Sequence, residues 1–184
     1  MSVGEPDFMT PGFIKEAGKK AIDDNYSKYS PVPGYPVLRE AIARKLKREN
    51  GLDYAASEII VGTGGKQGVC NAILALVNPG DEVVIPAPYW VSYPQMVKLA
   101  GGTPVIVPAG IGQDFKITAA QLEAAVTPKT KLVILCSPSN PTGSVYSEEE
   151  LGELAKVVLA HDDLFVLSDE IYEHINYIGG HSSI

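Results

Sequence analysis

Apolar positions along the chain change their spacing near residue 58. Before that point they recur at helical spacing in two stretches, 13–22 and 38–46. The first predicted helix opens at Thr10-Pro11, with Thr10 as N-cap, and the second ends at Asn50-Gly51. The proline-rich segment 30–36 separates them, because proline is excluded from helix interiors and central strands. Two helices joined by a non-helical connection are therefore predicted before residue 58.

Beyond residue 58, short β-branched runs alternate with helical segments. Strands are predicted at 58–61, 82–85, 103–107, 131–136 and 164–168. Helices are predicted at 66–77, 91–100, 118–126 and 147–160. The last helix opens with a capping box, since Glu150 follows Ser147 by three residues. Alternation of this kind is typical of a parallel sheet covered by helices, so an α/β fold is predicted.

Composition and charge exclude several classes of protein. The 184 residues are 45% hydrophobic and carry a net charge of −7. Because the basic residues are scattered, neither a nucleic-acid face nor a membrane patch is expected. No apolar run is long enough to cross a bilayer, and the amino end has no signal-peptide pattern. Cys70 and Cys136 stand alone in apolar stretches, which indicates buried thiols and a cytoplasmic protein.

Candidate chemistry lies at the ends of the predicted strands, where open α/β sheets bind their ligands. The first strand leads through Gly62-Thr63-Gly64-Gly65-Lys66 into a helix, a pattern typical of a phosphate site. It is not a Walker A loop, because Ile60 and Gln67 stand where glycine and Ser or Thr are needed. It is not a dinucleotide fingerprint either, because Pro86 stands where an acid should end the second strand. A close-packed turn without a ligand remains the alternative.

Three further strand ends carry unusual residues. Trp90 follows the second strand and could offer an aromatic face to a planar ligand, or be a core tryptophan. Asn140 lies between prolines after the fourth, with Asn140-Pro141 as a candidate cis bond, and a plain turn is the alternative. Asp169 ends an apolar strand and so needs a partner, with Tyr172 close by. A helix-capping or ion-paired aspartate is the alternative there.

Taken together, these features predict a site for a flat, phosphorylated, basic heterocycle. Pyridoxal 5'-phosphate meets each requirement, since its pyridinium needs an acidic partner. His161, His174 and His181 lack ligand spacing, and no metal site is predicted.

The chain resembles the fold-type I pyridoxal-phosphate enzymes, in the class I aminotransferase family, near the bacterial aspartate aminotransferases. The stretches that carry the resemblance occur in family order: Ser2 to Phe8, Lys28-Tyr29 with Gly34, Gly64-Gly65-Lys66, Pro88 to Pro94, Pro138 to Gly143 and Ser168 to Tyr172. The resemblance implies a three-layer large domain with a mainly parallel sheet, incomplete here. It assigns residues 1–35 to the amino-terminal, small-domain and dimer-contact segment, and 36–184 to the amino-terminal portion of the cofactor-binding large domain.

The resemblance also implies roles for individual residues. The cofactor-binding residues would be Gly64, Gly65, Lys66, Trp90, Asn140, Asp169, Tyr172 and Tyr29. Trp90 would stack on the pyridine ring and Asp169 would keep the ring nitrogen protonated, while the loop backbone would hold the phosphate. Asn140 and Tyr172 would form hydrogen bonds to the phenolic oxygen of the ring. Tyr29 would reach the cofactor phosphate of the other subunit in a homodimer. Gly4, Trp90 and Asn140 would bind the substrate.

The chain departs from the family pattern in one respect that bears on catalysis. The family's Schiff-base lysine follows the Asp–Tyr motif by a few dozen residues, whereas Lys156 is the last lysine here and Arg48 the last arginine. The catalytic lysine is therefore expected beyond residue 184, and no residue of the chain is predicted to be catalytic. By the resemblance, two more strands would insert between the first predicted strand and the fourth. The chain is interpreted as truncated at both ends.

Three functional hypotheses remain. The first is a fragment of an aminotransferase that acts on an amino acid, with an acidic one such as aspartate preferred, and a 2-oxo acid. The second keeps the cofactor but cleaves carbon–sulfur bonds, as a β-lyase does. The third is a shortened, non-catalytic binding protein.

Overall fold

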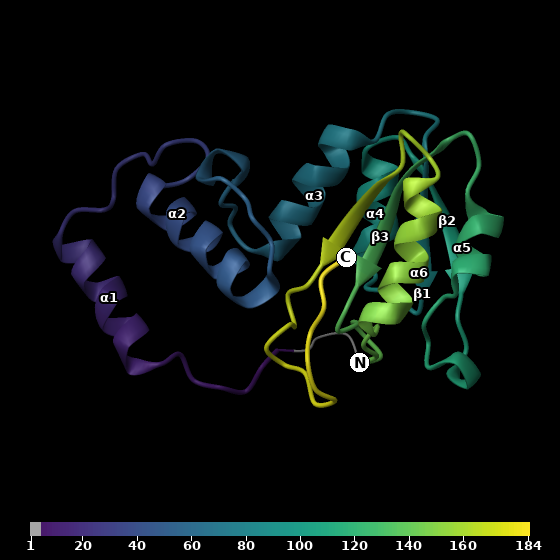
Figure 1. Ribbon diagram of the computed structural model, residues 1–184. Helices are drawn as coiled ribbons and strands as arrows, with labels where there is room; N and C mark the ends of the chain where they lie inside the picture. The colour runs from purple at the N-terminus through teal and green to yellow at the C-terminus, as the bar shows by residue number, and fades with distance from the viewer. Residues whose placement is uncertain (1–4) are drawn as a thin grey trace.

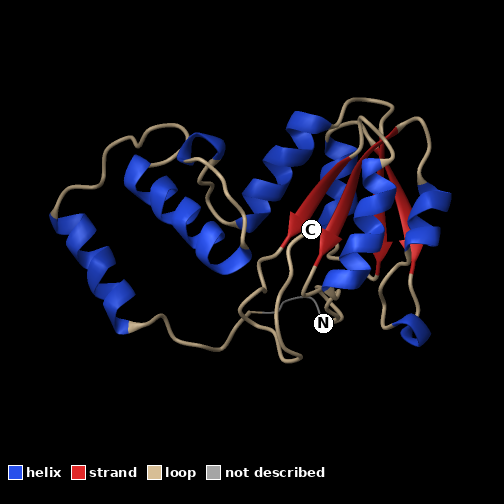
Figure 2. Ribbon diagram, in the orientation of Figure 1, coloured by secondary structure: helices blue, strands red, loops and turns tan. Residues whose placement is uncertain are grey.

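The computed structural model describes residues 5–184 and shows a parallel sheet flanked by helices (Figures 1 and 2). The strands are β1 (Glu82–Ala87), β2 (Thr103–Pro108), β3 (Thr130–Cys136) and β4 (Phe165–Asp169). The α-helices are α1 (Gly12–Asp23), α2 (Pro36–Lys45), α3 (Gly65–Leu76), α4 (Ser92–Leu99), α5 (Ala119–Ala125) and α6 (Glu148–Leu159). Short helical turns occur at η1 (Leu46–Asn50), η2 (Ala56–Glu58) and η3 (Ile111–Gln113).

The four strands of this described sheet lie in the order β2-β1-β3-β4, and every pair is parallel. Their register brings the carboxyl ends of the strands together at one end of the sheet: Ala87 pairs with Pro108, and Cys136 pairs with Asp169. Loops that leave these ends therefore meet on one side of the sheet, where a ligand can reach several of them.

Helices cover both faces of the sheet, because successive residues of each buried strand point to opposite sides. On one face Val84, Val133 and Leu135 pack against α5 and α6. On the other face Val83, Ile85, Leu132 and Ile134 pack against α3 and α4. The predicted α/β class and its three layers are confirmed.

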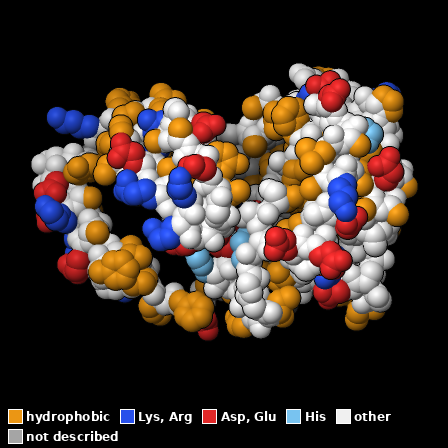
Figure 3. All heavy atoms as spheres, in the orientation of Figure 1, with side chains coloured by type: hydrophobic (Ala, Val, Ile, Leu, Met, Phe, Trp, Pro, Cys, Tyr) orange, Lys and Arg blue, Asp and Glu red, His pale blue; other side chains and the backbone are white. Residues whose placement is uncertain are grey.

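The helices α1 and α2 lie apart from this sandwich (Figure 1), and none of their own residues is buried. Figure 3 shows apolar side chains exposed along this part of the molecule. The most exposed large apolar side chains before α3 are Phe8, Met9, Phe13, Ile22, Tyr29, Val32, Val37 and Ile60. Within residues 5–184, no helix is both long enough and apolar enough to cross a membrane.

Most predicted elements are present, and their boundaries follow local signals. Thr118 and Ser147 cap α5 and α6 through capping boxes, and Gly51 closes η1 with φ of 72°. The N-cap expected at Thr10 is wrong: α1 begins at Gly12, Pro11 is its N-cap and no side chain caps it.

The strand predicted at 58–61 is not formed. Glu58 ends the turn η2, the Ile59 N–H bonds the Ala56 carbonyl at 3.3 Å, and the Val61 N–H bonds the Pro33 carbonyl at 3.0 Å. A β-branched run forms a strand only where a neighbouring strand accepts its hydrogen bonds, and none of the described strands lies beside this segment.

The expected position of the missing strands also needs correction. β4 pairs with β3, which is the fourth strand of the prediction, so no strand can insert on that side of β3. The edge strands of the described sheet are β2 and β4, so any further strand would have to pair at one of these two edges.

Candidate active site at the carboxyl ends of the strands

The glycine-rich loop forms the amino-terminal end of α3. Gly64 is the N-cap, with φ of 85° and ψ of 161°, a backbone conformation open essentially to glycine alone. The Gly68 N–H bonds the Gly64 carbonyl at 3.3 Å, and the Thr63 N–H bonds the Gln67 side chain. The N–H groups of the first helical turn have no partner inside the helix, so they are available to an anion.

One pocket brings together most of the predicted site. It is lined by the predicted residues Gly65, Lys66, Trp90, Asn140, Asp169 and Tyr172, and also by Tyr93, Cys136 and Ile171. These residues come from α3, α4, β3, β4 and the loops that follow the strands. Gly64 adjoins the pocket as the N-cap of α3.

Asp169 has hydrogen-bond partners on both carboxylate oxygens. The Tyr93 hydroxyl donates to Oδ2 at 2.7 Å, and the Ile171 N–H donates to Oδ1 at 3.3 Å. The Ser137 N–H bonds the Asp169 carbonyl at 3.2 Å, which ties the end of β4 to the end of β3. No cation pairs with Asp169 in the described part of the chain. The alternative of an ion-paired aspartate is therefore not supported.

Trp90 is partly buried beside Lys66 and Tyr93. Its ring meets the Tyr93 ring edge-on, with centroids 5.3 Å apart and planes at 90°. The Lys66 ammonium lies 5.0 Å from the Trp90 ring centroid, a cation–π contact. Sequence reasoning gave Lys66 a backbone role, but its side chain also lies in the pocket.

Asn140 is held in a tight loop after β3. The Asn140-Pro141 bond is cis, as expected, and so are Ser137-Pro138 and Ala87-Pro88. The Ser139 N–H bonds the Ser144 carbonyl, and the Gly143 N–H bonds the Ser139 carbonyl, each at 2.9 Å. A loop closed in this way presents the Asn140 amide to the pocket from a fixed backbone.

Sequence reasoning did not assign Tyr93 to the site, and it expected Cys136 to be a buried thiol. Burial, followed by the neighbouring Cys136 and Asp169, raises the pKa of Tyr93 well above its usual value. Burial also raises the pKa of the Cys136 thiol, whose Sγ lies 3.4 Å from the Pro138 carbonyl oxygen. The spacing of Trp90 and Tyr93, three residues apart at a helix start, was the signal available for Tyr93. Cys136 is only partly buried and lines the pocket.

A sequence model of the family described as aminotransferase class I and II matches residues 1–180. The chain belongs to this family. It is 56% identical over 175 residues to the aspartate/prephenate aminotransferase of Cereibacter sphaeroides, covering 95% of this chain and 44% of that protein. It is 50% identical to a probable aspartate/prephenate aminotransferase of Thermus aquaticus, covering 100% of this chain and 48% of that protein.

Solved aminotransferase structures agree with the fold of the chain. The aspartate aminotransferase of Rhizobium meliloti superposes with a TM-score of 0.94 at 47% identity, over 96% of this chain and 44% of that structure. The Thermus thermophilus enzyme with maleate superposes with a TM-score of 0.96 at 48% identity, over 98% of this chain and 47% of that structure. The chain thus spans a little under half the length of these aminotransferases.

The family resemblance also assigned Tyr29 to the site, but Tyr29 does not line the pocket. Tyr29 lies in the connection between α1 and α2 and is fully exposed. Gly4 lies outside the described residues.

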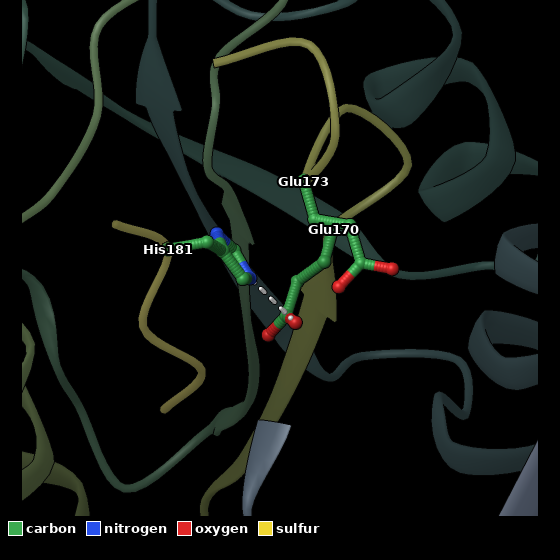
Figure 4. Close-up of side chains that lie close together, drawn as sticks. All are labelled: Glu170, Glu173 and His181. Atoms are coloured by element: carbon green, nitrogen blue, oxygen red, sulfur yellow. Dashed lines mark hydrogen bonds and ion pairs between the residues drawn. The ribbon is translucent and has the colours of Figure 1, made fainter. Parts of the chain in front are cut away.

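A second polar cluster lies beyond β4, where no metal site was predicted (Figure 4). His181 Nε2 lies 2.9 Å from Glu170, and Glu173 pairs with Lys45 and with the Asn50 amide at 2.9 Å. Burial alone would raise the pKa of Glu173, but Lys45 and Asn50 outweigh it and lower the pKa. Since both carboxylates already have partners, the cluster is an ion-pair network that joins the end of α2 to the final residues.

Proposed function

We propose that this chain forms the cofactor-holding part of a pyridoxal 5'-phosphate-dependent aminotransferase. The observation that carries the proposal is the convergence of the α3 amino terminus, Trp90 and Asp169 on one pocket. The named functions of the relatives, aspartate/prephenate and aspartate aminotransferases, support it. The reaction would move an amino group between an amino acid and a 2-oxo acid.

The residues present fit such a cofactor. The exposed N–H groups of the first turn of α3 would bind a phosphate, and the half-buried Trp90 face would stack on a planar ring. No cation from residues 5–184 pairs with Asp169, so its carboxylate can hold a positive charge at a ring nitrogen. When bound, the cofactor supplies an electron sink for carbanion chemistry. The Asn140 amide and the Tyr172 hydroxyl would orient the ring through its phenolic oxygen.

We further propose an acidic amino acid as substrate and a homodimer as the assembly. Substrate contacts are assigned to Gly4, Trp90 and Asn140. The full exposure of Tyr29 supports the dimer, because a tyrosine that serves the partner's phosphate site should not be buried within its own chain. The cysteine and charge pattern of the sequence supports a cytoplasmic location.

The test uses the full-length protein, meaning the gene product that contains this chain. It is incubated with pyridoxal 5'-phosphate, aspartate and 2-oxoglutarate, and a parallel sample receives a cysteine thioether. Glutamate formed from 2-oxoglutarate supports the proposal. Pyruvate and ammonia released from the thioether without glutamate formation would identify a β-lyase instead. A protein that binds the cofactor but forms neither set of products would point to the binding protein.

A further inference from the structure

Tyr93 is the buried side chain that touches both aromatic and acidic parts of the pocket. It is the second residue of α4 and only 2% exposed. Its ring packs edge-on against Trp90 with centroids 5.3 Å apart, and its hydroxyl lies 2.7 Å from Asp169 Oδ2. A single side chain therefore links the proposed stacking surface to the proposed partner of the ring nitrogen.

The direction of this hydrogen bond is determined by chemistry. An ionised carboxylate only accepts, and a neutral phenol has one proton to donate. Burial first, and then Cys136 and Asp169, raise the pKa of Tyr93 far above neutrality, so the phenol stays protonated. The hydrogen bond from the Ile171 N–H to Oδ1 is longer, at 3.3 Å. The shorter bond from Tyr93 therefore restricts the orientation of the carboxylate more strongly.

We propose that Tyr93 is a positioning residue whose hydroxyl holds the Asp169 carboxylate in the orientation that pairs with the ring nitrogen of the cofactor. The inference rests on the proposed function and names a residue that the family resemblance did not assign. The Tyr93 hydroxyl takes one acceptor site on Oδ2 and the Ile171 N–H takes one on Oδ1, so the oriented carboxylate keeps acceptor sites for the ring nitrogen. Without the hydroxyl, the carboxylate can rotate about its last bond, and part of the ionic pairing with the ring is lost.

The test separates this role from simple core packing by changing the ligand as well as the residue. Binding of pyridoxamine 5'-phosphate, which needs no Schiff base, is measured by fluorescence titration of the cofactor-free full-length protein. It is compared with binding of the 1-deaza analogue, in which a C–H group replaces the ring nitrogen. Tyr93→Phe should weaken the binding of pyridoxamine phosphate about tenfold, because a hydrogen bond to a charged group is lost. The affinity of the deaza analogue should change less than about twofold, since it has no ring nitrogen for Asp169 to pair with.

Tyr89→Phe is the matched control. Tyr89 precedes Trp90, is partly buried and lines the neighbouring cavity. Its hydroxyl makes no hydrogen bond to any residue in the range 5–184. Removing that hydroxyl should leave both affinities unchanged.

Equal losses for the two ligands would overturn the positioning role, because they would show that Tyr93 only supports the pocket. No loss for either ligand would overturn it too. If Tyr93→Phe does not fold, 4-aminophenylalanine at position 93 keeps the ring and a hydrogen-bond donor. This variant should still bind pyridoxamine phosphate more tightly than the deaza analogue. Loss of that preference despite the retained donor would also contradict the proposal. A wild-type protein that prefers neither ligand over inorganic phosphate would instead refute the proposed function.

Discussion

Asp169 is the one carboxylate among the described residues that line the proposed cofactor pocket. It is partly buried at the end of β4, accepts two hydrogen bonds and has no cation beside it among the residues described. Its negative charge is therefore available for a positive ligand group. The neighbours Trp90, Asn140 and Tyr172 can stack on or bond a ring, but none of them can supply that charge.

Asp169→Asn should slow transamination by the full-length protein about a hundredfold or more, the scale of losing one electrostatic group from an active site. The amide has a similar shape but no charge to hold the pyridine nitrogen protonated. Cofactor binding should weaken less, because the phosphate and stacking contacts remain. Steady-state rates and cofactor titrations measure the two effects.

An N-methylated cofactor analogue provides the control for this variant. Its permanent positive charge does not depend on Asp169, so it should restore part of the lost rate. Turnover of Asp169→Asn close to that of the wild type would show that the acid has another role.

At the scale of elements, α6 shows how one helix start combines several local signals. The Ser147 side chain accepts from the Glu150 N–H at 3.2 Å, and the Glu150 carboxylate accepts from the Ser147 N–H at 2.7 Å. Lys116 pairs with the same carboxylate at 2.8 Å. The cap therefore also anchors the loop that precedes α5.

Ser147→Ala should lower the free energy of unfolding by about 1 kcal/mol, the usual effect of losing a helix cap. Urea unfolding of the full-length protein measures the change. Ser27→Ala is the control, since Ser27 is exposed and its side chain has no hydrogen-bond partner within the described range. Equal stability of the two variants would contradict a stabilising cap.

The charge of Glu150 predicts a dependence of stability on pH. Burial alone would raise its pKa, but Lys116 and the Ser147 N–H outweigh burial and lower the pKa from its usual value. A carboxyl with a lowered pKa stabilises the folded state above its unfolded pKa and loses this contribution as the pH falls through the folded value. Glu150→Gln should therefore lower the melting temperature at pH 7 more than at pH 3. A difference that does not change with pH would show that the charge is not involved.

At the scale of the whole molecule, the lysines decide whether this chain can catalyse. Lys66 lies over Trp90 in the pocket, and Lys156 is exposed on α6 with Glu153 as its partner. Neither follows the Asp169-to-Tyr172 segment, where the family resemblance places the Schiff-base lysine.

The purified 184-residue chain should show no transaminase activity, even with saturating cofactor, because the covalent and proton-transfer steps lack their amine. A coupled assay with aspartate and 2-oxoglutarate measures it. Activity that persists in Lys66→Ala and Lys156→Ala variants would show that the amine is not required.

The exposed surfaces predict how the chain behaves by itself. The outer edge of β4 is unpaired within the described sheet, and α1 and α2 bury no residue. Unpaired strand edges and exposed apolar faces promote association. The isolated chain should therefore aggregate or lose fixed packing, despite its net charge of −7. Near-ultraviolet circular dichroism at Trp90 and light scattering test this, and a monodisperse monomer that unfolds cooperatively would contradict it.

Local features of this protein could be predicted from sequence, because their causes lie within a few residues. The cap at Ser147, the turn at Gly51 and the cis Asn140-Pro141 bond were expected and are present. The residues singled out at three strand ends, Trp90, Asn140 and Asp169, line one pocket. Parallel strands bring such ends to one edge whatever the details of packing.

Tertiary structure decided the features that depend on a partner distant in sequence. The apolar run at 58–61 has strand-forming residues but no neighbouring strand, so it stays unpaired. Tyr93 and Asp169 are 76 positions apart, and only the packing of α4 against the sheet brings the hydroxyl to the carboxylate. Sequence patterns specify what each segment can form, whereas hydrogen bonding and burial between distant segments determine which of those possibilities occurs.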